Sequence, residues 1–249
     1  DLEAVLSLEA VGCKDWLTNK VDRCVGGLVA KQQCTGALQL PLNNCGVMAL
    51  DFEGKHGIAT SVGHSPVAAL IDPVAGSRNA VAEALTNIIW APLSQGLKSV
   101  SLSANWMWPA NNPGENARLY KAVKGISDFA LELGINIPTG KDSLSMKQKY
   151  PGQDVKSPGT VIVSAAGHCD DISSVIEPNF KLGQGPVFYL DLSQMQPCLG
   201  GSSWAQTKNK IGDQAPDVCD AQYLAKSFNA IQQLIKEGLI VAGHDVASG

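Results

Sequence analysis

The sequence lacks the features that mark membrane proteins, nucleic-acid-binding proteins and zinc proteins. No apolar run reaches the roughly 18 to 20 residues that a membrane-spanning helix requires. The formal net charge of −4 provides no basic field for nucleic acid or anionic lipid. The seven cysteines are odd in number and scattered, without the paired spacing of a zinc site. We therefore expect free thiols in the reducing cytoplasm, with no membrane partner and no nucleic-acid partner.

Several catalytic signatures are also absent. The chain has no GxSxG motif of serine hydrolases, no HExxH motif of zinc proteases and no GxGxxG motif after a strand. Residues 140–143 (Gly-Lys-Asp-Ser) resemble the end of a phosphate-binding loop, but the upstream glycine of that motif is missing. Residues 199–203 are compatible both with an anion-binding nest and with an ordinary tight turn.

The composition is that of an ordinary globular protein, with 45% hydrophobic and 17% charged residues over 249 positions. Strand and helix patterns alternate irregularly, which indicates an α+β fold with a mixed sheet and flanking helices. The predicted strands are 25–30, 46–51, 98–102, 160–167 and 187–192. The predicted helices are 77–91, 117–133 and 221–237. Residues 105–109, which contain two tryptophans, are predicted to form a packed loop.

The predicted helix over residues 77–91 carries a polar stripe. Apolar residues cover most of its circumference, which is typical of a buried helix. Asn79, Glu83 and Asn87 recur at i, i+4 and i+8, so they lie on one face. Carboxylate and amide oxygens suit Mg²⁺, especially Mg²⁺ that also contacts nucleotide phosphates. The same spacing is common on the solvent side of a half-buried helix, so the spacing alone leaves both interpretations open.

Sequence blocks in a fixed order are more specific than any single motif. They begin near Lys14 and cover residues 22–23, 26–29, 39–41, 43–45, 63–68, 83–88, 102–107, 113–115, 140–146, 199–202 and 244–245. In this order the chain resembles the large, single-chain phosphoribosylformylglycinamidine synthase family, in its second aminoimidazole-ribonucleotide-synthetase-like half. The Glu-Ala-Leu-Thr-Asn block at 83–87 and the Gly-Lys-Asp-Ser block at 140–143 are the most telling.

The resemblance implies a ligase of purine biosynthesis. Members of this family convert formylglycinamide ribonucleotide, ATP and glutamine to formylglycinamidine ribonucleotide, ADP, phosphate and glutamate. Their partners lie within one long polypeptide, namely the first synthetase-like half and a glutaminase domain that delivers ammonia. In the large form, the second half holds a tightly bound structural nucleotide. The resemblance therefore implies that this chain is an internal fragment that is inactive by itself.

A polar stretch with glycine and proline indicates a domain boundary, and the resemblance identifies the parts on either side of it. Residues 1–170 correspond to the synthetase-like N-terminal subdomain, 171–185 to a polar linker with glycine and proline, and 186–249 to a truncated C-terminal subdomain. In this family such N-terminal subdomains pair their sheets into a shared barrel. An isolated copy would expose that apolar face, so we expect the fragment to dimerise.

Carried over by position, the metal ligands of the family fall at Asn44, Glu83, Asn87 and Asp245. The family usually has aspartate at the position of Asn44. An asparagine keeps a carbonyl oxygen but loses the formal charge, so we expect weaker binding of Mg²⁺.

The nucleotide contacts fall at Lys14, Asn43 and Ala247, and the family usually has serine at the position of Ala247. Because two positions of one site depart from the family pattern, we expect the isolated chain to bind ATP or ADP weakly or not at all. Lys141, Asp142 and Ser143 are expected on a loop that reaches the substrate.

Two other interpretations remain open from the sequence. One is another ATP-binding enzyme of the same superfamily, such as aminoimidazole ribonucleotide synthetase, selenophosphate synthetase or thiamine monophosphate kinase. The other is a noncatalytic domain that binds a nucleotide or serves as a scaffold. The block at 83–87 and the tryptophan segment favour the amidotransferase.

Overall fold

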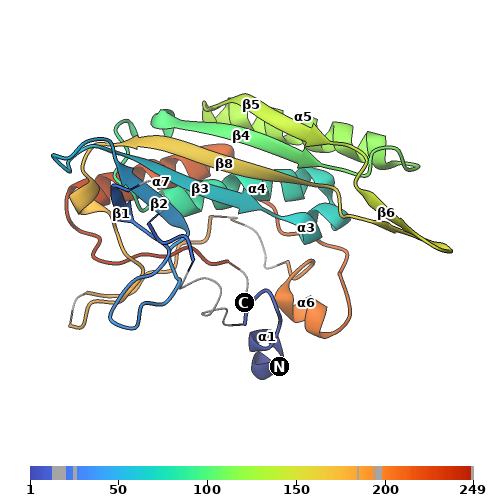
Figure 1. Cartoon of the computed structure of the whole chain (residues 1–249), viewed down its shortest axis with the longest axis horizontal. Coiled ribbons are helices and arrows are strands. Elements are labelled where there is room, and N and C mark those ends of the chain that lie inside the picture. Colours follow the sequence, from blue (N-terminus) through green and yellow to red (C-terminus); the bar gives the residue numbers. More distant parts are fainter. Residues whose placement is uncertain (13–20, 25–26, 184, 193, 195–197, 248–249) are drawn as a thin grey trace.

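The computed structural model describes residues 1–12, 21–24, 27–183, 185–192, 194 and 198–247. Its centre is a six-stranded mixed sheet in the order β1-β2-β3-β8-β4-β5 (Figure 1). The strands are β1 Val29–Lys31, β2 Cys45–Ala49, β3 Gly57–His64, β4 Val100–Met107, β5 Asn136–Ser143 and β8 Thr160–Cys169. Neighbouring strands are antiparallel except β4 and β5, which are parallel. The predicted α+β fold with a mixed sheet is confirmed.

Helices cover one face of this sheet. The longer ones are α4 Pro73–Ile88, α5 Glu115–Leu133 and α7 Ala221–Lys236, and the short α3 Pro66–Ile71 precedes α4. Two other short helices, α1 Leu2–Leu6 and α6 Ser203–Thr207, lie beside each other and away from the sheet (Figure 1). Two 3₁₀ turns, η1 Gly96–Ser99 and η2 Ile172–Ser174, and a separate hairpin of β6 Lys147–Tyr150 and β7 Gln153–Lys156 complete the elements. Among the described residues, no helix combines the length and apolar character needed to cross a bilayer.

Local sequence explains where the main helices begin and end. Asp72 caps α4 by accepting hydrogen bonds from the backbone N–H groups of Val74 (2.7 Å) and Ala75 (3.1 Å), and Pro73 suits the first helical position. Helix α5 ends at Gly134, whose φ of 70° favours glycine. The cap formed by Asp72 and Pro73 starts α4 one turn earlier than the apolar pattern of this helix predicts.

Helix α4 lies unusually close to β3. A Cβ atom on Gly63 would lie 2.2 Å from the carbonyl oxygen of Ala80 and 2.3 Å from the backbone nitrogen of Ala84, so only glycine allows this approach. Ser61, also on β3, donates a hydrogen bond from its hydroxyl to the Ala84 carbonyl (2.6 Å). The close contact fixes the height of α4 above the sheet.

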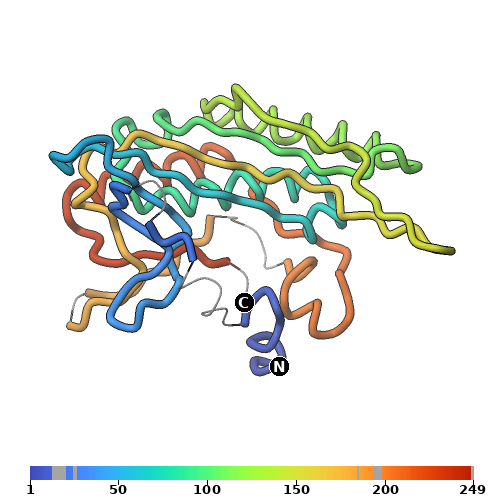
Figure 2. Tube along the Cα trace, in the orientation of Figure 1, coloured from blue at the N-terminus to red at the C-terminus, as the bar shows by residue number. Residues whose placement is uncertain are grey.

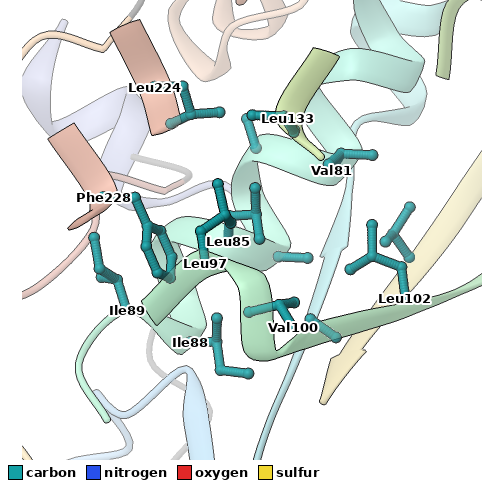
Figure 3. Packing of buried hydrophobic residues seen from close by; sticks show 14 of the residues in the cluster. Val81, Leu85, Ile88, Ile89, Leu97, Val100, Leu102, Leu133, Leu224 and Phe228 are labelled. Carbon is teal, nitrogen blue, oxygen red and sulfur yellow. The ribbon is translucent and has the colours of Figure 1, made fainter. Parts of the chain in front are cut away.

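The core fills the space between the sheet, α4, α5 and α7. Figure 3 shows its centre, where Leu85 and Ile88 of α4 meet Leu102 of β4 and Phe228 of α7. All four side chains are at most 1% exposed. Because α7 contributes to this core, the chain on both sides of residues 171–185 packs together. The domain division at that point stays a prediction.

Several sequence predictions are wrong in detail. Residues 187–192 form no strand, and Phe188 and Tyr189 are largely exposed, because no described strand pairs with them. Asn105 and Trp106 continue β4 instead of forming a loop, since β8 and β5 pair with them on both sides. Figure 2 shows the irregular path of the chain between β8 and α7, which is interrupted only by short helical turns among its described residues.

Candidate functional site

A cleft of about 1210 Å³ extends across the sheet, lined by residues of β1, β2, β3, β8, β4 and β5, and reaches the middle of α4 and the C-terminal segment. Its polar lining includes Lys31, Asn43, Asn44, Glu83, Asn87 and His244. The register of β2 with β3 ends at the pair Cys45–Ser61, so β3 continues past its partner toward His64. The cleft therefore lies beside backbone that the sheet leaves partly unpaired.

Two side chains of α4 satisfy this part of β3. Glu83 accepts a hydrogen bond from the backbone N–H of His64, and the Asn87 amide donates to the carbonyl of Val62 at 2.9 Å. The two residues are one helical turn apart, as the polar stripe predicts. The stripe does not extend to Asn79, whose amide donates to the carbonyl of Pro216 at 2.7 Å.

Asn87 leaves one polar atom without a partner. The residue is only 4% exposed, and its Oδ1 atom is buried and accepts no hydrogen bond from the described residues. Native proteins rarely leave buried acceptors unsatisfied, because each costs about 1–3 kcal/mol. An unpartnered oxygen beside a carboxylate is the arrangement in which a bound cation removes the penalty.

A second pair of site residues comes from opposite ends of the chain. The Asn44 amide donates to both carboxylate oxygens of Asp245, at 3.0 and 3.1 Å. The Asp245 side chain is 3% exposed, and the imidazole Nδ1 of His244 lies 3.5 Å from its Oδ1. Asn44 thus keeps a buried carboxylate hydrogen-bonded next to the cleft.

The electrostatics connect the two pairs. Burial raises the pKa of Glu83, the charge of Asp245 raises it further, and the hydrogen bond from the His64 backbone and the His64 ring oppose the shift. The structure therefore brings Asn44, Glu83, Asn87 and Asp245 to one region. Within the described residues, no three His, Cys, Asp or Glu side chains are grouped so that they could hold a metal. The set around Glu83 differs from such a group because it consists of two carboxylates and two amides.

The positions predicted to contact a nucleotide are only partly described. Lys14 lies outside the described residues. Asn43 lines the cleft, and its amide donates to the carbonyl of Gln32 (2.7 Å) and to Glu177 Oε2 (3.2 Å). Ala247 lines the same cleft and is exposed.

The structure adds Lys31, which sequence reasoning missed. Lys31 is 4% exposed, lines the cleft and donates from Nζ to the carbonyl of Ile176. Burial lowers its pKa, against the opposing effects of Cys45, Glu177 and Asp245. A lysine at the end of a short apolar run was the available sequence signal, because such a side chain is buried only where polar partners receive it.

The predicted substrate residues lie elsewhere. Lys141, Asp142 and Ser143 belong to β5 rather than to a loop, because β4 pairs with them in parallel. Lys141 Nζ is exposed and donates to Ser143 Oγ and to the carbonyl of Asp142. Since β5 and β1 form opposite edges of the sheet, these three residues do not join the set around Glu83.

The FGAR-AT PurM_N-like domain model matches residues 13–168. The chain is 44% identical over 250 residues to phosphoribosylformylglycinamidine synthase of Homo sapiens, covering 100% of this chain and 19% of that protein. It is 45% identical over 253 residues to the Drosophila melanogaster enzyme of the same name, covering 100% and 18%. The chain thus spans about a fifth of the length of these relatives.

A solved structure supports the fold. Thermotoga maritima PurL complexed with FGAR aligns with a TM-score of 0.55 at 16% sequence identity. The alignment covers 86% of this chain and 32% of that chain. At this identity the likeness concerns the fold alone.

Proposed function

This chain belongs to the phosphoribosylformylglycinamidine synthase family, whose FGAR-AT PurM_N-like domain matches residues 13–168, and from that premise we propose that it is one synthetase-like half of a glutamine-dependent ligase. The proposed reaction converts formylglycinamide ribonucleotide to formylglycinamidine ribonucleotide, with ATP to activate the amide oxygen and ammonia to displace the phosphate. Its partners are the other synthetase-like half and a glutaminase domain in the same long polypeptide. We place this enzyme in the cytoplasm, in keeping with the free thiols of Cys24, Cys45, Cys169 and Cys219.

We further propose that the cleft holds an adenine nucleotide, ATP or ADP, with Mg²⁺. The observation that carries this proposal is the buried Oδ1 of Asn87, which has no partner within the described part of the chain and lies beside the carboxylate of Glu83. Asp245 supplies the second carboxylate and Asn44 a second amide, so the donors are all hard oxygen ligands of the kind that Mg²⁺ prefers. When bound, Mg²⁺ neutralises the charge of a polyphosphate.

Each protein group has a role that follows from its contacts. Glu83 and Asn87 are held at a fixed height by hydrogen bonds to β3, which orients one oxygen of each residue without using all of its acceptor capacity. Asn44 orients Asp245 through its amide hydrogens. If Asn44 is itself a ligand, its amide must rotate to present the carbonyl oxygen, at the expense of the bond to Asp245. That competition, together with the formal charge that an asparagine lacks at position 44, is why we propose weak binding in the isolated chain.

The test uses the whole polypeptide and a matched pair of neutral substitutions. Glu83→Gln removes a charge from the cleft, whereas Glu132→Gln removes an exposed charge from α5. We expect Glu83→Gln to weaken Mg²⁺ and ADP binding about tenfold or more, because affinity follows ligand charge. Glu132→Gln should bind like the parent. Equal binding by both variants, measured by calorimetry, would remove the proposed site.

A second measurement separates a structural nucleotide from a consumed one. Nucleotide extracted from the purified polypeptide is identified before and after turnover with formylglycinamide ribonucleotide and glutamine. A structural role predicts the same bound ADP before and after turnover, together with reduced stability in Glu83→Gln. Exchange of the bound nucleotide at the rate of turnover would instead make this cleft the site where ATP is consumed.

Two surfaces remain for the other partners. We propose that Lys141, Asp142 and Ser143 contact the substrate, since the first two present exposed polar groups and Ser143 a half-buried hydroxyl on the outer strand of the sheet. We also propose that the sheet face opposite α4 packs against a second sheet. That face presents apolar side chains that are 40–49% exposed, from Met48, Ile58 and Val62, and Met48 and Val62 also line the cleft, so the partner sheet would adjoin the nucleotide. In the isolated chain a second copy is the available partner, which would make it a dimer.

A further inference from the structure

We infer that Gly243 and Trp90 are positioning residues that hold Asp245 at the cleft. This inference rests on the proposed magnesium and nucleotide site and concerns how that site is assembled. Asp245 lies 162 positions after Glu83 in the sequence, so no local element fixes their separation. Some contact must hold the C-terminal segment against the end of α4, and the packing of Gly243 on Trp90 meets that need.

Trp90 follows α4 directly and shares a face with its site residues. Glu83, Asn87 and Trp90 are spaced i, i+4 and i+7, which places all three on one side of the helical path. The helix ends at Ile88 with Ile89 as its C-cap in an αR conformation, so the spacing persists to the first residue beyond the cap. Helix α4 therefore carries two candidate ligands, and the residue after its C-cap carries the ring that supports a third.

The contact between Gly243 and Trp90 has no room for another atom. A Cβ atom on Gly243 would lie 2.0 Å from Cζ3 of the Trp90 ring and 2.5 Å from Cε3 and Cη2. Gly243 is not among the residues with positive φ, so its backbone conformation suits other residues as well. The indole ring alone thus accounts for the need for glycine.

Two backbone hydrogen bonds, through residues 176–177, also connect Trp90 to Gly243. The carbonyl of Trp90 accepts a hydrogen bond from Ile176 N–H (2.9 Å), and the carbonyl of Glu177 accepts one from Gly243 N–H (3.1 Å). Lys31 donates to the Ile176 carbonyl from the other side. Trp90 therefore holds Gly243 twice, directly through its ring and indirectly through residues 176–177.

The geometry indicates how far an added methyl group would move Asp245. Non-bonded carbons normally lie about 3.5 Å or more apart, so a methyl at 2.0 Å must retreat by about 1.5 Å. Asp245 is two residues away and follows the backbone. A comparable shift would stretch the hydrogen bonds between Asn44 and Asp245 from about 3.0 Å to well beyond hydrogen-bonding distance.

The experiment measures binding of Mn²⁺ and ADP to the whole polypeptide by electron paramagnetic resonance, with Mn²⁺ in place of Mg²⁺. Gly243→Ala should weaken binding by about 10- to 100-fold, the range found for residues that orient metal ligands. Trp90→Leu removes the ring that the new methyl meets. The double variant Gly243→Ala/Trp90→Leu should therefore bind within about threefold of Trp90→Leu alone.

Controls separate positioning from folding and from failure of the site. Leu239→Ala, at an exposed position (66%) of the preceding segment, should bind like the parent. Asp245→Asn should lose binding; if it binds normally, the proposed site is wrong and the inference falls with it. If Asp245→Asn loses binding while Gly243→Ala does not, only the positioning role is refuted. If Gly243→Ala does not fold, Trp90→Ala tests the same contact, and unchanged binding there refutes it.

Discussion

The unpartnered amide oxygen of Asn87 allows a prediction in which stability and binding respond in opposite ways to two similar substitutions. Asn87 and Gln232 are both buried amides, 4% and 2% exposed. Among the residues that the structure describes, Asn87 donates one hydrogen bond, and its Oδ1 accepts none. Gln232 accepts from the backbone of Leu93 (2.8 Å) and donates to the carbonyls of Ile89 (2.6 Å) and Ala91 (2.9 Å).

The expected change in stability follows from these contacts. Asn87→Leu loses one bond and leaves the Val62 carbonyl unpaired, but it also removes an unsatisfied buried oxygen. Losses and gains of about 1–3 kcal/mol nearly cancel, so the free energy of unfolding without ligand should change by about 1 kcal/mol at most. Gln232→Met loses three hydrogen bonds and leaves three backbone groups without this partner, which at about 1 kcal/mol or more each lowers the free energy of unfolding by at least about 3 kcal/mol.

The gain in the free energy of unfolding on ligand binding should show the reverse order, with the larger loss in Asn87→Leu. At Mg²⁺–ADP concentrations of about ten times Kd, binding stabilises the chain by about 1.4 kcal/mol. If Asn87→Leu raises Kd tenfold, the increment at that concentration falls to about 0.4 kcal/mol. Gln232→Met should keep the full increment. Thermal unfolding by calorimetry, with and without ligand, measures both quantities. A full ligand increment in Asn87→Leu, or a lost one in Gln232→Met, would refute the reasoning.

Three further predictions concern other parts of the molecule. In the whole polypeptide, Lys141→Ala should raise KM for formylglycinamide ribonucleotide with unchanged thermal stability; unaltered kinetics would exclude this residue from the substrate site. Light scattering should find the isolated chain as a dimer, and Val62→Asp should make it monomeric, whereas a monomeric parent chain at high concentration would contradict the proposed sheet pairing. Burial raises the pKa of the Cys45 thiol to about 11, so Cys45 should resist alkylation at pH 8 while exposed Cys219 reacts. Because the pKa is raised in the folded state, the contribution of Cys45 to the free energy of unfolding is fully present below about pH 8.5 and is lost as the pH rises toward 11. Denaturant titrations that show no such loss would contradict this prediction.

Much of the fold follows from local patterns in the sequence. Apolar residues cover most of the circumference of α4 and fall on one side of α5 and α7, so their periodicity predicts these helices to within about one turn. Helix α4 begins earlier than its apolar pattern because Asp72 and Pro73 form a cap that periodicity does not register. The spacing of Glu83 and Asn87 likewise places both on one helical face before any tertiary contact is known.

Other features depended on contacts between distant residues. Residues 187–192 have the composition of a strand but form none, because a strand needs a partner and the described chain supplies none there. Residues 141–143 have the composition of a loop but join β5, because β4 lies beside them. Whether an extended segment becomes a strand is decided by its neighbours across the sheet.

The candidate site divides in the same way. The sequence alone determined the residue types and the helical spacing of Glu83 and Asn87, since both are properties of a short segment of chain. Only the tertiary structure decided that Asn44 meets Asp245, 201 positions away, and that the ring of Trp90 rests on Gly243. These contacts depend on how close two backbones approach, and that distance is set by the packing of the whole core rather than by local conformational preference.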